Sequence, residues 1–139
     1  MKNSKKFSVC IVVFLFLINI GIAAIAEPRV SHLRYSHIYD IIADLSIVGS
    51  TARCSGYVRP SSNTSSSKVV VKLQKQVNGL WKTIKSWSGN AVSGGRAQAG
   101  GEYTVNTGYK YRVVTKATVM NADGTVLEEA TATSATQSY

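Results

Sequence analysis

The sequence predicts an all-β domain of about seven short strands, preceded by a helical signal peptide. Three observations carry this fold class. Apolar and polar residues alternate with a period of two in several segments, as they do in half-buried strands. Turn-forming Gly, Asn and Pro recur between those segments. No segment after residue 26 repeats its apolar residues with the helical period of 3.6 over ten residues. Together these features are typical of a β-sandwich.

The first 26 residues have the three parts of a secretory leader. A cationic start at residues 1–6 precedes an unbroken apolar run from Val9 to Ile18, and Ala24-Ile25-Ala26 supplies the small residues that signal peptidase requires. We therefore expect cleavage before Glu27 and export of the remainder. The alternative is an uncleaved anchor, because residues 9–26 just reach the length that spans a bilayer.

Size and charge limit what the exported chain can be. The whole chain has 139 residues and a net charge of +9, and the leader accounts for 26 residues and three lysines. The remaining 113 residues carry +6, which is enough chain for one domain, expected over residues 37–139, and too little for two cores. Cys54 is the single cysteine beyond the leader, so a disulfide scaffold is excluded. Its place on the small, apolar side of an alternating segment predicts a buried thiol.

The first half of the domain contains two predicted hairpins. Residues 27–36 show no period and are expected to form an extended arm. The segment Ile41–Ile47 alternates as a strand, and Gly49-Ser50 supplies a turn before a second strand over residues 51–59. The polar tract Ser61–Ser67 is expected to be a mobile surface loop, because it carries little apolar surface to pack.

The second hairpin contains the tryptophans. Val69–Leu73 begins the third predicted strand, and Asn78-Gly79 favours a tight type I′ turn. The fourth strand returns through Trp81, Ile84 and Trp87. Ile84 has the opposite parity to both tryptophans, and a β-bulge is one explanation.

The glycine-rich residues 89–101 are predicted to form a flexible connection with at most a short edge strand. Beyond them, Tyr103–Val105 is expected to be a strand, and Tyr109–Met120 is expected to be the longest one. A strong turn signal at residues 121–124 precedes a last strand over Thr125–Thr136, in which Ala and Thr alternate.

One local pattern narrows the fold. Val105 lies six residues before Tyr111, with Gly108 between them and Val113 two residues beyond. This spacing resembles the tyrosine corner of immunoglobulin-like and fibronectin type III domains, in which the phenol hydroxyl bonds back to the chain upstream. The alternative is an ordinary strand that carries a tyrosine. The spacing makes an immunoglobulin-like or fibronectin type III-like sandwich the expected topology, with Tyr111 in a structural role.

Five segments of the chain form a recognisable set: Arg34–Ile38, Leu73–Lys75, Trp81–Trp87, Gly108–Val113 and Ala130–Ser134. Together they resemble an uncharacterised family, a domain of unknown function, whose members are small secreted β-sandwich proteins of Gram-positive bacteria. The most distinctive of these segments is Trp-Lys-Thr-Ile-Lys-Ser-Trp at residues 81–87. The resemblance covers nearly all of the exported chain and implies export and an immunoglobulin-like β-domain. It brings no catalytic residues and no activity.

Catalytic and metal-binding patterns are sparse. His32, His37 and Asp40 form the one His/Asp cluster, and it offers three potential metal ligands without a fourth. Surface histidines beside a strand are the alternative interpretation, and we predict no metal. The carboxylate pairs Asp40 with Asp44 and Glu128-Glu129 are expected on solvated strand faces. No hydrolase, metalloprotease or phosphate-loop motif occurs. We therefore expect no enzymatic activity and no cofactor.

Basic residues are the candidate binding residues. They recur on neighbouring predicted strands and favour a cationic sheet face: Lys72, Lys82, Lys85, Lys110, Arg112 and Lys116. Such a face would attract anionic cell-wall polymers or lipid headgroups, and plain solubility is the alternative. Trp81 and Trp87 could stack against glycans, although core packing is the favoured explanation in a domain without Phe.

The expected function is that of a secreted, non-enzymatic binding module associated with the cell wall or envelope. A secreted antimicrobial or toxin-like effector is the alternative, suggested by small size, export and positive charge. An effector of this kind should carry an amphipathic cationic helix or an exposed apolar patch, and neither is evident in the sequence. Nucleic acid is not an expected partner, because no binding motif occurs and export removes the usual substrate. Membrane contact is expected only through an uncleaved leader.

Overall fold

The computed structural model describes residues 35–139, in which the regular secondary structure is entirely β. The leader predicted at residues 1–26 and most of the arm predicted at residues 27–36 lie outside this range. The strands are β1 (Ile38–Val48), β2 (Thr51–Pro60), β3 (Ser66–Val77), β4 (Leu80–Val92), β5 (Ala97–Thr104), β6 (Lys110–Met120), β7 (Val126–Thr133) and β8 (Gln137–Ser138).

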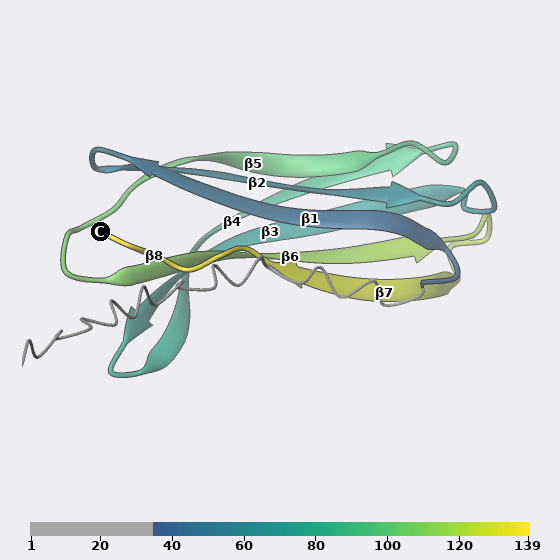
Figure 1. Ribbon diagram of the computed structural model, residues 1–139. Helices are drawn as coiled ribbons and strands as arrows, with labels where there is room; N and C mark the ends of the chain where they lie inside the picture. Colours follow the sequence, from purple (N-terminus) through teal and green to yellow (C-terminus); the bar gives the residue numbers. More distant parts are fainter. Residues whose placement is uncertain (1–34) are drawn as a thin grey trace, which may run out of the picture.

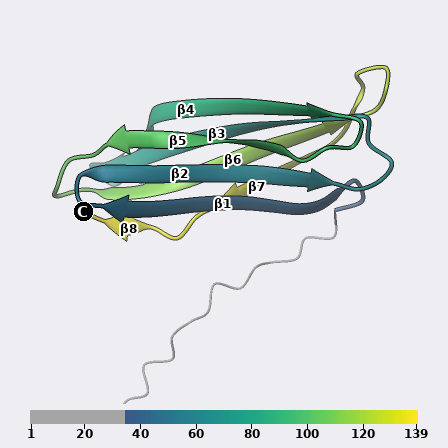
Figure 2. The same cartoon turned by 90° about the horizontal axis from the view of Figure 1, so that it is seen from above.

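The strands form two antiparallel sheets that pack face to face, which confirms the predicted β-sandwich (Figures 1 and 2). One sheet has the order β1-β2-β5 and the other has the order β4-β3-β6-β7, with the short β8 added to β6. Because β3 follows β2 and β5 follows β4, the chain crosses between the sheets after each of the first two hairpins, and it crosses again from β5 to β6.

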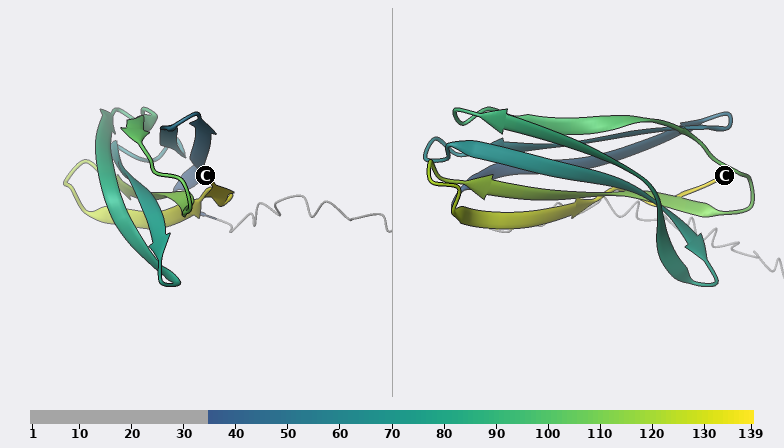
Figure 3. Two further views of the ribbon diagram at one scale, coloured as in Figure 1. Left: turned by 90° about the vertical axis from the view of Figure 1, so that its left-hand side faces the viewer. Right: turned by 180° about the vertical axis from the view of Figure 1, so that it is seen from behind.

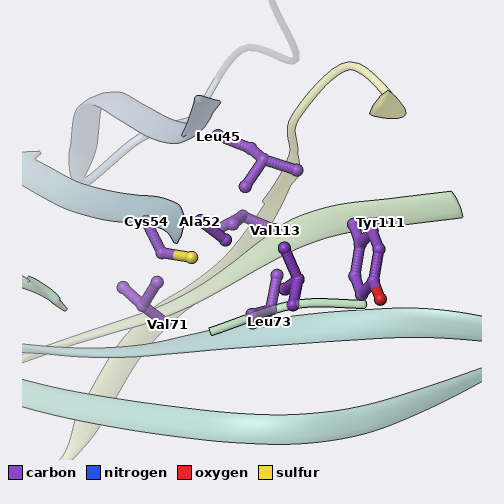
Figure 4. Packing of buried hydrophobic residues seen from close by; sticks show 8 residues of the cluster. Leu45, Ala52, Cys54, Val71, Leu73, Tyr111 and Val113 are labelled. Atoms are coloured by element: carbon purple, nitrogen blue, oxygen red, sulfur yellow. The ribbon is translucent and has the colours of Figure 1, made fainter. Parts of the chain in front are cut away.

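Alternating side chains from both sheets fill the space between them. On β2, Ala52, Cys54 and Val58 are buried as the period-two pattern predicted. One core cluster surrounds Cys54 and Tyr111, and Figure 4 shows its side chains meeting between β2, β3 and β6. A second cluster, which includes Val58, lies toward the start of β1. The two clusters together form a core that extends along the length of the sandwich.

The tyrosine-corner contact expected from the spacing is present. The ring of Tyr111 is 1% exposed at the start of β6. Its hydroxyl donates to the carbonyl oxygen of Asn106 at 2.8 Å and accepts from the Asn106 N–H at 3.1 Å. These two hydrogen bonds thus tie the connection between β5 and β6 to the start of β6.

The β3–β4 hairpin has the predicted turn and the predicted bulge. Asn78 and Gly79 have φ values of 51° and 77°, as a type I′ turn requires. Leu73 pairs with Lys85 and Gln74 pairs with Thr83, so Ile84 is the extra residue of the bulge. The bulge shifts the register by one residue, and every β4 side chain between it and the turn changes face.

Residues 89–101 do not form the predicted flexible connection with at most a short edge strand, although β5 does lie at the edge of its sheet. β4 continues to Val92, and β5 pairs with β2 along its whole length from Ala97 to Thr104. Gly89 and Gly101 allow close approach between the two sheets. A Cβ at Gly101 would lie 2.5 Å from the indole nitrogen of Trp87, and one at Gly89 would overlap the carbonyl oxygen of Gln98.

Two other boundaries differ from the prediction. Ser66 and Ser67, placed in a mobile loop by the sequence, begin β3, and the buried Ser67 hydroxyl donates to the carbonyl oxygen of Gly95 at 2.9 Å. The last predicted strand ends at Thr133, and the chain continues to β8. There the Gln137 side chain donates to the carbonyl oxygen of Leu45 at 2.7 Å and so joins the two sheets.

Candidate functional site

The outer surface of the β4-β3-β6-β7 sheet carries a group of basic side chains. On β3, Lys72 pairs with Val114 of β6, and Gln74 pairs with Arg112. The residues between them, Leu73 and Val113, are buried, so the paired residues on either side point outward. Side chains at directly paired positions project from the same face of a sheet. The residues of this group, called here the basic face, are Lys68, Lys72, Lys110, Arg112 and Lys116.

The structure therefore brings together four of the six predicted basic residues. Lys68 was missed, although its parity with Lys72 in the sequence was a usable signal. Lys82 and Lys85 do not belong to the basic face. Lys82 pairs with Lys75, on the side of the sheet that faces Tyr111, because the bulge at Ile84 reverses its orientation. Lys85 opposes the buried Leu73 and is exposed at the β4 edge of the sheet.

Local contacts hold two members of the basic face in place. The ammonium of Lys116 lies 3.1 Å from Glu129 Oε1, and this hydrogen bond and charge lower the pKa of Glu129. Arg112 Nε donates to Gln74 Oε1 at 2.8 Å. Within residues 35–139, no carboxylate forms an ion pair with Lys68, Lys72, Lys110 or Arg112. The basic face is therefore positively charged overall.

The two tryptophans have different environments. Trp87 is half-buried against the core cluster around Cys54, as the core interpretation expects. Trp81 is not a core residue. The bulge places it opposite Gln76 on the outer side, where the Arg112 guanidinium lies 4.2 Å from the centroid of its ring. Trp81 is thus part of the surface next to the basic face, and a cation covers one side of its indole.

Cys54 is buried as predicted. Its exposed fraction is 4%, and it is a free cysteine. Burial and the charge of Asp44 raise the pKa of the thiol from 9.0 to about 11. The thiol therefore stays protonated near neutral pH, which disfavours a nucleophilic or redox role.

The predicted His/Asp cluster is not assembled in the part of the chain that the structure covers. His32 lies outside it, and Asp40 accepts a hydrogen bond from the Tyr57 hydroxyl at 3.1 Å. Between residues 35 and 139 no group of three or more His, Cys, Asp or Glu side chains could hold a metal ion. The prediction that Glu128 lies on a solvated face is wrong, because its carboxylate accepts hydrogen bonds from three backbone N–H groups, those of Ser36, His37 and Ile38.

A hollow of about 450 Å³ on the opposite sheet was not predicted. It lies over the pairing of β2 with β5, where Gly56, Ala99 and Gly100 contribute little side-chain volume. Its charged group is Arg96, whose guanidinium stacks 3.9 Å from the centroid of the Tyr57 ring. The same guanidinium donates to Gln98 Oε1 at 3.2 Å. No sequence pattern indicated this hollow, because it depends on the pairing of β2 with residues 97–100, which were expected to belong to a flexible connection.

Comparisons with known proteins found one kind of similarity, to solved structures. No family model matches the chain, and no curated protein matches it. Among solved structures, one similar chain is the sporulation control protein Spo0M from Bacillus subtilis, with 12% sequence identity and a TM-score of 0.44. The alignment covers 71% of this chain and 48% of Spo0M, so this chain spans about half the length of that protein. In residues 35–139 there is no helix long and apolar enough to cross a membrane.

Proposed function

We propose that this protein is an exported, non-enzymatic β-sandwich that binds anionic material of the cell envelope through the basic face. The observation that carries the proposal is the register of β3 and β6, which puts Lys68, Lys72 and Arg112 on the same face of the sheet. Lys116 adds a charge that Glu129 offsets. Parallel outward side chains concentrate the attraction for a polyanion such as a phosphate-rich wall polymer.

The proposal predicts binding that depends on salt. Interactions between exposed charges are screened beyond about 10 Å at 0.1 M ionic strength, so retention on purified cell walls should fall steeply as salt rises. A Lys68→Gln/Lys72→Gln variant should elute at lower salt than the wild type. An Arg53→Gln/Arg59→Gln variant removes the same charge from β2 in the other sheet and should elute with the wild type.

Other outcomes would point elsewhere. Equal weakening of both double variants would show that net charge, and not the basic face, controls retention. Retention that does not change with salt and is lost in Trp81→Ala would indicate glycan stacking on the side of the indole that Arg112 leaves free. The absence of any retention would contradict the proposal and favour the effector alternative.

A further inference from the structure

The β3–β4 hairpin extends beyond the sandwich. The pairing of β3 with β6 ends at Lys75 opposite Tyr111, and from Gln76 onward β3 pairs with β4 alone. Figure 3 shows this hairpin projecting away from the two sheets at one end of the molecule. The type I′ turn at Asn78-Gly79 closes it tightly, so its tip is a short, defined structure.

The tip of the hairpin is apolar. Val77 and Leu80 form the last pair before the turn, and Leu80 is 67% exposed. Trp81 follows on the opposite face of the hairpin. A single exposed leucine is ordinary on a protein surface. The residues immediately behind this one make it unusual.

Cations surround the hairpin one step behind the tip. Lys75 and Lys82 are paired two residues behind Val77 and Leu80, on the same face as those two side chains. Arg112 lies against Trp81 on the other face. The Lys75 ammonium lies 4.3 Å from the centroid of the Tyr109 ring, which positions it beside an aromatic residue. The whole segment from residue 45 to residue 101 contains no Asp or Glu, so nothing within the hairpin offsets these charges.

This order of groups matches the depth profile of a bilayer surface. Two residues of a strand span roughly 7 Å, which separates the apolar tip from the paired lysines. The headgroup layer on each side of a bilayer is about 5–8 Å thick. A leucine at the edge of the hydrocarbon would therefore leave the ammonium groups at the level of the phosphates. Tryptophan favours the interface between them.

We infer that the tip of the β3–β4 hairpin inserts into the headgroup layer of a bilayer that contains anionic phospholipid. This contact shares Arg112 with the basic face, but its apolar tip at Leu80 and its paired Lys75 and Lys82 lie outside that face, and it does not depend on binding to wall polymers. It also adds a route to the membrane other than the leader, through an apolar tip that the sequence did not reveal.

The test uses the full chain and follows the environment of Trp81. Vesicles of phosphatidylcholine, with or without phosphatidylglycerol, would carry brominated acyl chains that quench nearby indoles. The leader contains no Trp, so quenching reports on the domain even if the leader binds the vesicles. Trp81→Phe assigns the signal, because the other tryptophan, Trp87, packs against the core. Quenching of Trp81 is expected only with phosphatidylglycerol present.

Variants make the test specific. Leu80→Asp should weaken vesicle binding, as followed by the quenching, about tenfold or more, because a side chain that enters the apolar layer is replaced by a charge that anionic lipid repels. Lys75→Gln/Lys82→Gln should weaken the quenching and lower its sensitivity to salt, because two of the charges that salt screens are removed. Val92→Asp is the matched control, since Val92 is 74% exposed at the opposite end of β4, and it should bind as the wild type does.

Three results would overturn the inference. The first is unquenched Trp81 on anionic vesicles, and the second is equal losses for Leu80→Asp and Val92→Asp. The third is a dimer in vesicle-free solution that Leu80→Asp dissociates, which would make a second copy of this chain the occupant of the tip. Retention on cell walls, measured for Leu80→Asp in parallel, should be unchanged. Failure of wall binding and failure of membrane insertion are therefore distinguishable.

Discussion

Tyr111 and Asn106 are joined by two hydrogen bonds, because one phenol hydroxyl both donates to the Asn106 carbonyl and accepts from the Asn106 N–H. Tyr111→Phe removes both and keeps the ring. The expected loss is about 1 kcal/mol in the free energy of unfolding, since water can reach the exposed Asn106 in part. Urea unfolding would measure it. Tyr109→Phe, on an exposed ring two residues earlier, is the control, and equal effects of the two changes would contradict a structural role for the Tyr111 hydroxyl.

Gly56 should tolerate no side chain. A Cβ at this position would overlap Thr115 Oγ1 and lie 2.8 Å from Val71 Cγ2 in the closed core. Gly56→Ala should therefore destabilise the domain by about 1–3 kcal/mol, as overpacking does. Adding Thr115→Ala in the same chain should recover part of the loss, because it removes the overlapping atom. Thermal unfolding of the single and double variants tests this, and strictly additive losses would show that the two sites do not touch.

Burial of Cys54 should make stability fall at high pH. The thiol has a pKa of about 11 in the folded chain against 9.0 ordinarily, so the unfolded chain releases its proton first. The contribution of the buried neutral thiol to the free energy of unfolding is fully present below pH 9. It is lost as pH rises through 11, and the total loss is at most about 2–3 kcal/mol. The measurement is the difference between wild type and Cys54→Ala in urea unfolding across that range, which cancels the titration of Lys and Tyr. Parallel curves would argue against burial, as would rapid labelling of the native thiol.

The exported protein should begin at Glu27. The Ala24-Ile25-Ala26 sequence supports cleavage there, and intact-mass spectrometry of protein recovered from the culture medium would test it. A mass that includes residues 1–26 would instead indicate a membrane-anchored protein.

Strands that bury one face were predictable from sequence, and strands shaped by contact with a distant element were not. In β2 the alternation of Ala52, Cys54 and Val58 reports burial directly. Only the end of β5, at Tyr103 and Thr104, fell within a predicted strand, because Gly100 and Gly101 in its middle carry no apolar signal. The indole of Trp87 explains the absence of a side chain at Gly101, and it comes from a strand of the other sheet.

The basic face was predictable where regular alternation holds. Alternation within each strand correctly put Lys72 and Arg112 on the outer face, because no register shift occurs between β3 and β6. Lys82 was misplaced although the bulge itself was anticipated. A single extra residue at Ile84 turns Lys82 from the outer face to the other side of the hairpin. The apolar tip at Leu80 was likewise invisible, since its exposure depends on where β6 stops pairing with β3.

The three hydrogen bonds that the Glu128 carboxylate accepts from residues 36–38 have a consequence for orientation. They fix the point at which the chain enters β1, at the end of the sandwich opposite the β3–β4 hairpin tip (Figure 1). The start of β1 and the hairpin tip therefore lie at opposite ends of the long axis, so a contact made through the tip leaves the entry to β1 at the far end of the molecule.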